Sequence, residues 1–317
     1  MPHLLIAGRL HPAGLALIDG AKDVTCDYVE GISESSYAPL IGEADALVIR
    51  TQPLSSATIA RAARLKIVSR HGVGYDAVDV AALNQRQIPL CVVGDVNSLS
   101  VAEHAMALIL ASAKRLIRAD RSVRAGPWTW RDALEARELS HANLLIVGYG
   151  RSGRHLARMA QGFRMQTRAF DPHLVKQGWP EGPVTPVETL AEGLAWADVI
   201  SVHVPKAGRP VLGVAEFAQM KTGVIVVNTA RGGTVDEIAL ADALRQGRVS
   251  AAGLDVFNDE PPAREHPLLA FDQVVLSPHI AGVTEESAER MAVSSIQNVL
   301  DFFAGRLDPD LIVNRGF

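Results

Sequence analysis

Residues 144–153 read LLIVGYGRSG, and residues 154–163 continue as RHLARMAQGF. The first four residues are an apolar run typical of a buried strand, and the second stretch has the apolar spacing of a helix. Between them lies a complete G-x-G-x-x-G motif, whose glycines allow a tight turn and a close approach of a pyrophosphate to the helix N-terminus. The sequence therefore predicts a dinucleotide site at this turn. Its residues are Gly148, Tyr149, Gly150, Arg151, Ser152 and Gly153.

An acidic residue follows the next expected strand. That strand, TRAF at residues 167–170, ends directly before Asp171, which comes 18 residues after Gly153. The spacing is that of the carboxylate that accepts hydrogen bonds from an adenosine ribose. Because a carboxylate at this position repels the 2′-phosphate of NADP, we predict NAD as the cofactor.

Short β-branched runs alternate with helical patterns along the chain, which predicts parallel sheets with helices on both faces. Strands are expected at residues 3–8, 24–29, 46–50, 65–70 and 88–93, and in a second series at 144–148, 167–170, 198–203, 224–228, 250–256 and 274–277. Residues 100–124 contain no Gly or Pro and are predicted to form one long helix between the series. A last helix is expected from about Thr284 to Phe303, and the short tail after it should pack on the first domain.

The predicted fold class is α/β, with two doubly wound parallel-sheet domains. A chain of 317 residues exceeds the size at which one hydrophobic core usually stops growing. We expect one domain from residues 1–97 plus 291–317, which would bind the substrate, and a dinucleotide-binding domain from residues 98–290.

The composition excludes several classes of protein. The formal net charge is −4, which gives no basic footprint for nucleic acid. The apolar runs are shorter than the roughly 18 residues of a membrane span, and the N-terminus has no basic segment, so we expect a cytoplasmic protein. Cys26 and Cys91 are expected to be reduced thiols, and the absence of H-x-x-x-H and C-x-x-C patterns predicts no metal site.

Polar segments follow three successive strands of the second series: NTARGG at residues 228–233, DVFNDEP at 255–261 and SPHIAG at 277–282. The carboxyl ends of parallel strands are where open α/β sheets bind ligands. Hydride transfer to a keto acid needs a cation for the carboxylate and carbonyl, which suits Arg231, and a proton donor, which suits His279. Glu260 beside the imidazole would fix its orientation and favour its charged form. Taken singly, each residue also fits a surface ion pair or a solvated turn.

Six segments in order resemble the D-isomer-specific 2-hydroxyacid dehydrogenase family: SRHGVGYDAVD, NSLSVAEH, IVGYGRSG, NTARGGTVDE, GLDVFNDEPP and SPHIAG. Phosphoglycerate dehydrogenases, hydroxypyruvate and glyoxylate reductases and D-lactate dehydrogenases belong to it. The resemblance covers about residues 46–303. It implies a Rossmann NAD-binding domain inserted in a flavodoxin-like substrate domain, with both domains contributing to one cleft that closes around the acid.

The resemblance also implies roles for single residues. Arg231 would bind the substrate, Glu260 would tune the histidine, His279 would donate the proton, and the backbone of Val73 and Gly74 would receive the substrate carboxylate. Further residues implied to border NAD are His203, Pro205, Thr229, Ala230, Arg231, Asp255, His279 and Gly282.

The acid itself is left open by the sequence. Arg50 and Arg70 end two strands of the first domain, where they either face the distal end of the substrate or form structural ion pairs. Similar arginines engage the phosphate in phosphoglycerate dehydrogenases. Reduction of hydroxypyruvate or glyoxylate is the first choice, and oxidation of 3-phosphoglycerate or sulfolactate is the alternative.

Two interpretations concern partners. The C-terminal binding proteins share this fold and the catalytic trio, and use them to sense NAD and bind peptides, although the lack of basic tails argues for an enzyme here. Trp128 and Trp130 follow the predicted long helix, and the resemblance implies a homodimer interface in this region. The alternative is a hinge packed within one chain.

Overall fold

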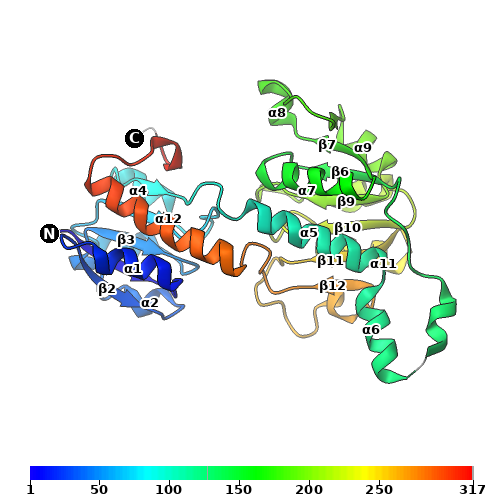
Figure 1. The fold of residues 1–317 in the computed structure, drawn as a ribbon, viewed down its shortest axis with the longest axis horizontal. Coiled ribbons are helices and arrows are strands. Elements are labelled where there is room, and N and C mark those ends of the chain that lie inside the picture. Colours follow the sequence, from blue (N-terminus) through cyan, green and yellow to red (C-terminus); the bar gives the residue numbers. More distant parts are fainter. Residues whose placement is uncertain (127, 316–317) are drawn as a thin grey trace. The chain divides into compact units, whose positions relative to one another are not determined.

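The computed structural model describes residues 1–126 and 128–315, so Pro127 and residues 316–317 lie outside the described part. The chain divides into two compact units, one formed by Met1–Asn97 and Val283–Phe317 and the other by Ser98–Gly282 (Figure 1). The predicted junction at residues 290 and 291 would cut a continuous helix, α12 (Glu285–Phe303). This helix buries Ala292, Ile296 and Val299 in a core cluster of the first unit. The boundary therefore precedes the helix.

The first unit contains a five-stranded parallel sheet in the order β2-β1-β3-β4-β5, which is the flavodoxin order. Its strands are β1 (His3–Ala7), β2 (Thr25–Val29), β3 (Ala46–Ile49), β4 (Ile67–Arg70) and β5 (Leu90–Cys91). Side chains alternate between the two faces, because Leu4 and Ile6 pack in the cluster that contains α12, whereas Leu5 and Ala7 pack in the other. Its remaining helices are α1 (Pro12–Gly20), α2 (Glu34–Tyr37), α3 (Ser56–Arg61) and α4 (Val80–Gln85).

The C-terminal tail completes this sheet. Ile312 forms an antiparallel bridge with Cys91, and the amide of Leu90 donates to Oδ1 of Asn314 at 2.7 Å. Both cysteines are free, and burial raises the pKa of the Cys91 thiol to about 12 and that of Cys26 to about 11. The thiols are therefore protonated at neutral pH.

The second unit contains a seven-stranded parallel sheet in the order β12-β11-β10-β9-β6-β7-β8, wound in both directions from β6 as in a Rossmann domain. Its strands are β6 (Asn143–Val147), β7 (Gln166–Phe170), β8 (Thr185–Pro186), β9 (Val199–Val202), β10 (Val224–Asn228), β11 (Val249–Leu254) and β12 (Val274–Leu276). The edge strand β8 was not predicted, because two residues that include a proline carry no alternating pattern. The fold class predicted from the sequence is confirmed.

Helices cover both faces of the second sheet (Figure 1). The core on one face includes residues of α5 (Ser98–Ala113) and α7 (Arg151–Gly162), and that on the other includes residues of α9 (Leu190–Trp196), α10 (Val214–Gln219) and α11 (Glu237–Arg245). A short helix, α8 (Pro172–Gln177), follows β7. No helix within residues 1–126 and 128–315 is long and apolar enough to cross a membrane.

The prediction of one helix over residues 100–124 is wrong. Helix α5 ends at Ala113, and α6 (Leu116–Ala125) begins after Arg115, which has a left-handed backbone with φ of 54°. The guanidinium of Arg115 donates to the carbonyl of Ser250 at 2.8 Å, and the amide of Arg137 donates to the carbonyl of Ala113. These tertiary contacts break the helix where the sequence has neither Gly nor Pro.

Candidate active site

The glycine-rich turn joins β6 to α7, and two of its glycines are required by close packing. Gly148 has φ of 96°, and a Cβ there would lie 2.7 Å from the carbonyl oxygen of His203. A Cβ on Gly153 would lie 2.5 Å from the carbonyl oxygen of Gly148. A side chain at Gly148 would push against the segment that follows β9, and a side chain at Gly153 would force α7 away from the turn.

Gly150 leaves an open space at the start of α7. A Cβ built on this residue meets no atom within 4 Å, and Gly150 is the N-cap of the helix without a side-chain hydrogen bond. The N-terminus of the 12-residue helix, which is the positive end of its dipole, therefore has open space beside Gly150. This arrangement fits the pyrophosphate of a dinucleotide.

Tyr149 contributes only its backbone to this surface. The residue is 8% exposed, and its ring stacks on Trp179 with 5.1 Å between ring centroids. The amide of Tyr149 donates to Oδ2 of Asp171 at 2.9 Å.

The carboxylate of Asp171 is fixed beside the turn. Its Oδ1 accepts from the amides of His173 and Leu174, both at 3.1 Å, and so caps α8. With Oδ2 held by Tyr149, the carboxylate has a set orientation and keeps lone pairs for the hydroxyls of a ribose. The spacing found in the sequence thus corresponds to a direct contact between Asp171 and the glycine turn.

His279 and Glu260 form a hydrogen-bonded pair. Nδ1 of His279 lies 2.7 Å from Oε2 of Glu260, and Oε1 of Glu260 accepts from the amide of Phe257 at 3.0 Å. His279 has a left-handed backbone with φ of 54°, held by a 2.8 Å hydrogen bond from its amide to the carbonyl of Asp255. Its side chain is 49% exposed, so the imidazole is anchored through Nδ1 and presents Nε2 to a ligand.

Asp255 supports the loop that carries His279. Its buried carboxylate accepts from the amides of Ile280 and Ala281 at 2.9 and 2.8 Å and from the hydroxyl of Ser277 at 2.6 Å. Nε2 of His104, on α5, lies 2.8 Å from the same hydroxyl. Asp255 therefore positions the histidine loop, a role that the sequence did not suggest. A histidine within the apolar pattern of α5 is the signal that points to such a buried partner.

The turn that carries Arg231 is also fixed by hydrogen bonds. Oδ1 of Asn228 accepts from the amide of Ala230 at 3.0 Å, and the hydroxyl of Thr234 donates to the carbonyl of Arg231 at 2.7 Å. A Cβ on Gly232 would lie 1.7 Å from the carbonyl oxygen of Phe257. The Arg231 turn and the Glu260 loop are therefore in direct contact.

Two polar residues near these loops are deeply buried. Thr229 is 6% exposed, and its Oγ1 has no hydrogen-bond partner within the described residues. Burial lowers the pKa of His203 to about 4, and its Nε2 lies 2.8 Å from Oγ of Ser201. His203 is thus neutral and forms part of the wall behind Gly148. Pro205 and Gly282, also predicted to border NAD, follow β9 and β12 at the same edge of the sheet.

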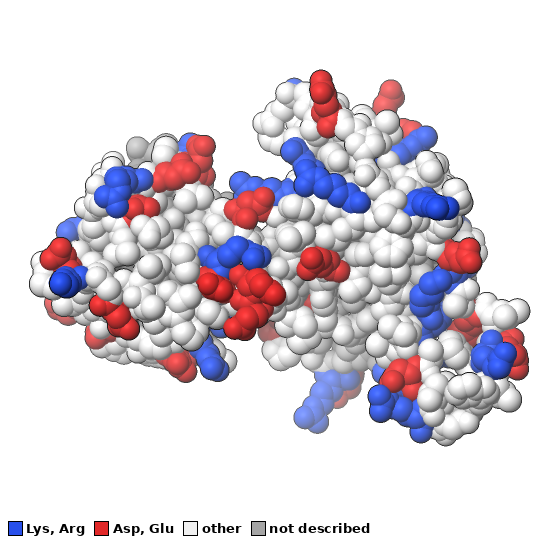
Figure 2. Space-filling model, in the orientation of Figure 1, with Lys and Arg blue, Asp and Glu red and all other residues white. Residues whose placement is uncertain are grey.

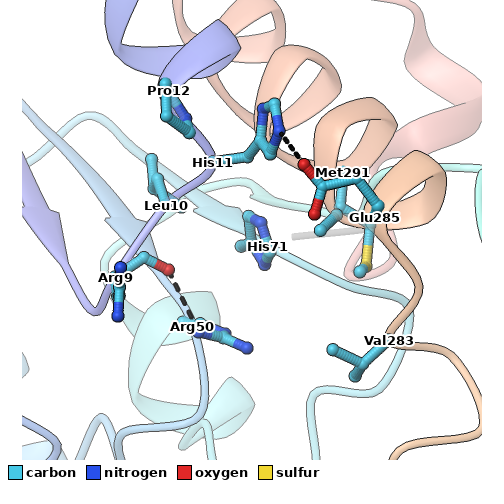
Figure 3. Close-up of a pocket in the computed structure, with 10 residues that line it drawn as sticks. Arg9, Leu10, His11, Pro12, Arg50, His71, Val283, Glu285 and Met291 are labelled. Atoms are coloured by element: carbon cyan, nitrogen blue, oxygen red, sulfur yellow. Dashed lines mark hydrogen bonds and ion pairs between the residues drawn. The ribbon is translucent and has the colours of Figure 1, made fainter.

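The predicted substrate residues of the first unit lie at the carboxyl ends of β3 and β4, where Arg50 follows β3 and Arg70 is the last residue of β4. Nη1 of Arg50 donates to the carbonyl of Arg9 at 3.1 Å (Figure 3), and Nη1 of Arg70 donates to the carbonyl of His71 at 2.8 Å. Val73 and Gly74 belong to the loop after Arg70, and Val73 is 37% exposed. The structure groups these residues in one unit and Arg231, Glu260 and His279 in the other.

Comparison with known proteins agrees with the geometry of the second unit. Residues 106–281 match the family model described as D-isomer specific 2-hydroxyacid dehydrogenase, NAD binding domain. The chain belongs to this family. The predicted family and the NAD-binding domain are thereby confirmed.

Two curated relatives have different lengths. The D-3-phosphoglycerate dehydrogenase of Archaeoglobus fulgidus is 39% identical over 87% of this chain, which spans only 52% of that relative. The hydroxypyruvate reductase of Thermotoga maritima is 37% identical over 87% of this chain and 90% of the relative.

Two solved structures share the whole fold. The D-lactate dehydrogenase of Aquifex aeolicus, in complex with NAD and lactic acid, has a TM-score of 0.87 and 27% identity, covering 99% of this chain and all of that one. An NADPH-dependent glyoxylate/hydroxypyruvate reductase of Sinorhizobium meliloti has a TM-score of 0.88 and 26% identity, covering 100% and 99%.

Proposed function

We propose that this protein catalyses reversible hydride transfer between NAD(H) and C2 of a small D-2-hydroxy or 2-keto acid. The observation that carries the proposal is the 2.7 Å contact between His279 and Glu260, whose loop also contacts the Arg231 turn. This combination supplies an oriented acid–base group beside a cation at the carboxyl edge of a dinucleotide-binding sheet.

Each residue of the trio has a separate task. NADH, when bound, supplies the hydride. Glu260 holds Nδ1 of the imidazole, so Nε2 of His279 gives a proton to the carbonyl oxygen in reduction and takes it back in oxidation. The guanidinium of Arg231 binds the carboxylate of the acid and stabilises the negative charge that develops on the carbonyl oxygen.

The relatives support two groups of acids. Hydroxypyruvate or glyoxylate is supported by the Thermotoga relative, which this chain covers almost completely, and by the Sinorhizobium structure. The first alternative, 3-phosphoglycerate, is supported by several D-3-phosphoglycerate dehydrogenases. The positions of Arg50 and Arg70 at strand ends favour both 3-phosphoglycerate and the second alternative, sulfolactate. Binding of the carboxylate by Val73 and Gly74 stays a prediction.

Steady-state kinetics with a panel of acids tests the proposal. Glyoxylate, hydroxypyruvate and pyruvate are assayed with NADH and NADPH, and 3-phosphoglycerate and sulfolactate with NAD and NADP. Turnover of at least one acid with the NAD couple is expected. NADH binding without any turnover would instead favour a nucleotide-sensing protein of the C-terminal-binding type.

We further propose that α6 and the 3-10 helix after it, Trp128–Ala133, form a homodimer interface. In Figure 1 this segment extends away from the sheet of its unit, and neither helix has a buried residue. Its exposed apolar side chains are Leu116, Ile117, Val123 and Trp128, and the exposed Leu134 follows directly. An apolar stretch of this kind favours a protein partner. Sedimentation equilibrium is expected to give a dimer, and a monomer at micromolar concentration would contradict the proposal.

Other partners are less favoured. On the face shown in Figure 2, basic and acidic side chains are interspersed over both units, a distribution that suits a small-molecule enzyme better than a nucleic-acid-binding protein. A cytoplasmic location stays a prediction of the sequence.

A further inference from the structure

A second carboxylate–imidazole pair lies behind the loop that carries Glu260. Nε2 of His266 is 2.9 Å from Oε2 of Glu237, and the two side chains are only 16% and 11% exposed. The corresponding values for the outer pair, His279 and Glu260, are 49% and 37%. The outer pair is open to a ligand, whereas the inner pair, Glu237 and His266, is enclosed by protein. Any part that the inner pair has in the reaction must therefore pass through neighbouring residues.

The hydrogen-bond partners of the inner pair fix the direction of its own hydrogen bond. Nδ1 of His266 accepts from the amide of Leu268 at 3.4 Å and so caps the 3-10 helix Pro267–Ala270. The imidazole hydrogen is therefore on Nε2, which donates to Oε2 of Glu237. Oε1 of Glu237 accepts from the amide of Asn258 at 2.6 Å. Since both oxygens accept, Glu237 serves as a carboxylate, and its bond to the Asn258 amide is charge-assisted.

Two successive backbone amides connect the inner pair to the outer pair. The amide of Asn258 donates to Glu237. The amide of the preceding residue, Phe257, donates to Oε1 of Glu260 at 3.0 Å, and the other oxygen of Glu260 bonds to the imidazole of the trio. The ring of Phe257 meets the imidazole of the inner pair edge to face, with 5.8 Å between ring centroids. The position of the Glu260 carboxylate thus depends on a short backbone segment, residues 257–258, that the inner pair holds.

The same segment is packed against the turn of Arg231. The two glycines after Arg231 leave no room for side chains here, because a Cβ on the first would overlap the carbonyl oxygen of Phe257 and one on the second would lie 2.8 Å from Oδ1 of Asn258. Glu237 follows Arg231 by six residues and begins α11. The turn and the carboxylate that holds the segment therefore belong to one stretch of chain, so removal of this carboxylate would release the segment from the turn.

We propose that Glu237 and His266 are positioning residues for the hydride transfer. They hold the backbone of residues 257–258 so that Glu260 stays within hydrogen-bond distance of Nδ1 of His279. This role rests on the function proposed above. Without the inner pair, the carboxylate of Glu260 would sample several positions, and the imidazole would lose the orientation that presents Nε2 to the acid.

A double-mutant cycle tests whether Glu237 acts through Glu260. Glu237→Ala is expected to lower kcat by about 10- to 100-fold, the effect of a misplaced catalytic group, with little change in the dissociation constant of NADH. In a Glu260→Ala background no carboxylate is left to position, so the same substitution should lower kcat by less than about threefold. Equal factors in the two backgrounds, or no fall in either, would overturn the inference.

Two changes at His266 separate a lost hydrogen bond from a lost ring. His266→Gln keeps an N–H that can donate to Glu237, so kcat should stay within about threefold of the wild type. His266→Phe keeps a ring and removes the donor, so kcat should fall by about 3- to 30-fold. Equal losses in the two variants would exclude His266 from the positioning role.

Thr189→Ala is the control for a general loss of stability. It removes the side-chain cap of α9, in the same unit, where the hydroxyl of Thr189 accepts from the amide of Glu192 at 3.2 Å. This variant should have a lower melting temperature and an unchanged kcat. A fall in kcat equal to that of Glu237→Ala would show that lost stability alone explains the effect, and would contradict the inference.

The tautomer of His279 gives a readout that needs no substrate. In nitrogen NMR of histidine-labelled protein, with the signal assigned by its loss in His279→Ala, the neutral imidazole should carry its hydrogen on Nδ1. Glu237→Ala and Glu260→Ala should both weaken this preference, and Thr189→Ala should keep it. If the wild type turns over no acid, the proposed function fails, but a changed tautomer in Glu237→Ala would still support positioning of Glu260 by the inner pair. An unchanged tautomer in Glu237→Ala would overturn it.

Discussion

At the scale of single residues, the proposed acid–base role depends on the orientation of His279. Because Glu260 occupies Nδ1, only Nε2 remains for a ligand. His279→Ala is expected to lower kcat by about 100- to 10,000-fold, the usual range for a lost acid–base group. The dissociation constant of NADH, measured by fluorescence, should change little.

Glu260→Gln is the companion variant to His279→Ala. An amide at this position can still accept a hydrogen bond from Nδ1 but does not stabilise the charged imidazole, so the loss of kcat should be smaller than in His279→Ala. Near-normal turnover in His279→Ala would remove this residue from the acid–base role.

Asp171 has two tasks, since its carboxylate caps α8 and lies beside the glycine turn. Asp171→Ala is expected to reduce the preference for NAD over NADP by about tenfold or more, because the repulsion of a 2′-phosphate and the bond to the ribose are both lost. The measurement is kcat/KM for each cofactor at one acid concentration.

Asp236 gives a matched control for the lost cap. Its Oδ1 accepts from the amides of Ile238 and Ala239 at the start of α11, in the same way as Asp171 caps α8. Both Asp→Ala variants should lower the melting temperature, whereas only Asp171→Ala should change the cofactor ratio. Equal ratios in the two variants would show that Asp171 does not contact the ribose.

At the scale of elements, two glycines of the turn between β6 and α7 are expected to have different roles. Gly153 is needed for packing, and Gly150 is proposed to leave room for the pyrophosphate. Gly153→Ala places a Cβ against the carbonyl of Gly148 and should lower the free energy of unfolding by about 1 to 3 kcal/mol.

The new methyl group of Gly150→Ala meets no protein atom, so the melting temperature should stay close to that of the wild type. NADH should bind at least about tenfold more weakly, because the methyl group enters the space proposed for the pyrophosphate. Unchanged NADH affinity in Gly150→Ala would place the cofactor elsewhere.

Most elements of the two sheets follow from sequence patterns, but their interruptions do not. The apolar runs of β1 and β10 predict strands because each is buried on both faces. The break at Arg115 depends on a contact with Ser250, 135 residues away, which no local pattern contains. The support of His279 by Asp255, Ser277 and His104 is likewise a long-range arrangement. Sequence spacing predicts that Arg231, Glu260 and His279 share one edge of the sheet because each follows a strand end, whereas the contacts behind His279 join residues that lie far apart in the sequence.

Within the whole molecule, two buried neutral histidines, one in each unit, predict acid sensitivity. His71 and His203 have pKa values lowered to about 4, mainly by burial, whereas an unfolded chain protonates histidine near 6.5. Below pH 6.5 both histidines of the unfolded chain bind a proton, whereas those of the folded protein do so only near pH 4. The free energy of unfolding should therefore fall as the pH drops from about 6.5 to 4.

The measurement is the melting temperature of the protein without cofactor between pH 7.5 and 5. The melting temperature of His203→Gln should fall less over this range than that of the wild type. The variant lacks one imidazole whose protonation favours the unfolded state. His173→Gln, which changes an exposed histidine of the same unit, should follow the wild-type curve. A pH dependence in His203→Gln equal to that of the wild type would contradict the role of this residue.

The pairing of both chain segments in the first unit has a consequence for biosynthesis. Residues 1–97 leave the ribosome with one face of their sheet covered only in part, by α1, because α12 and its Ala292, Ile296 and Val299 have not yet been made. At roughly 5 to 20 residues per second, synthesis of the intervening second unit takes about 10 to 40 seconds. During this interval the nascent chain exposes an apolar surface that a chaperone can bind, and the Rossmann domain has time to fold before the earlier unit is complete.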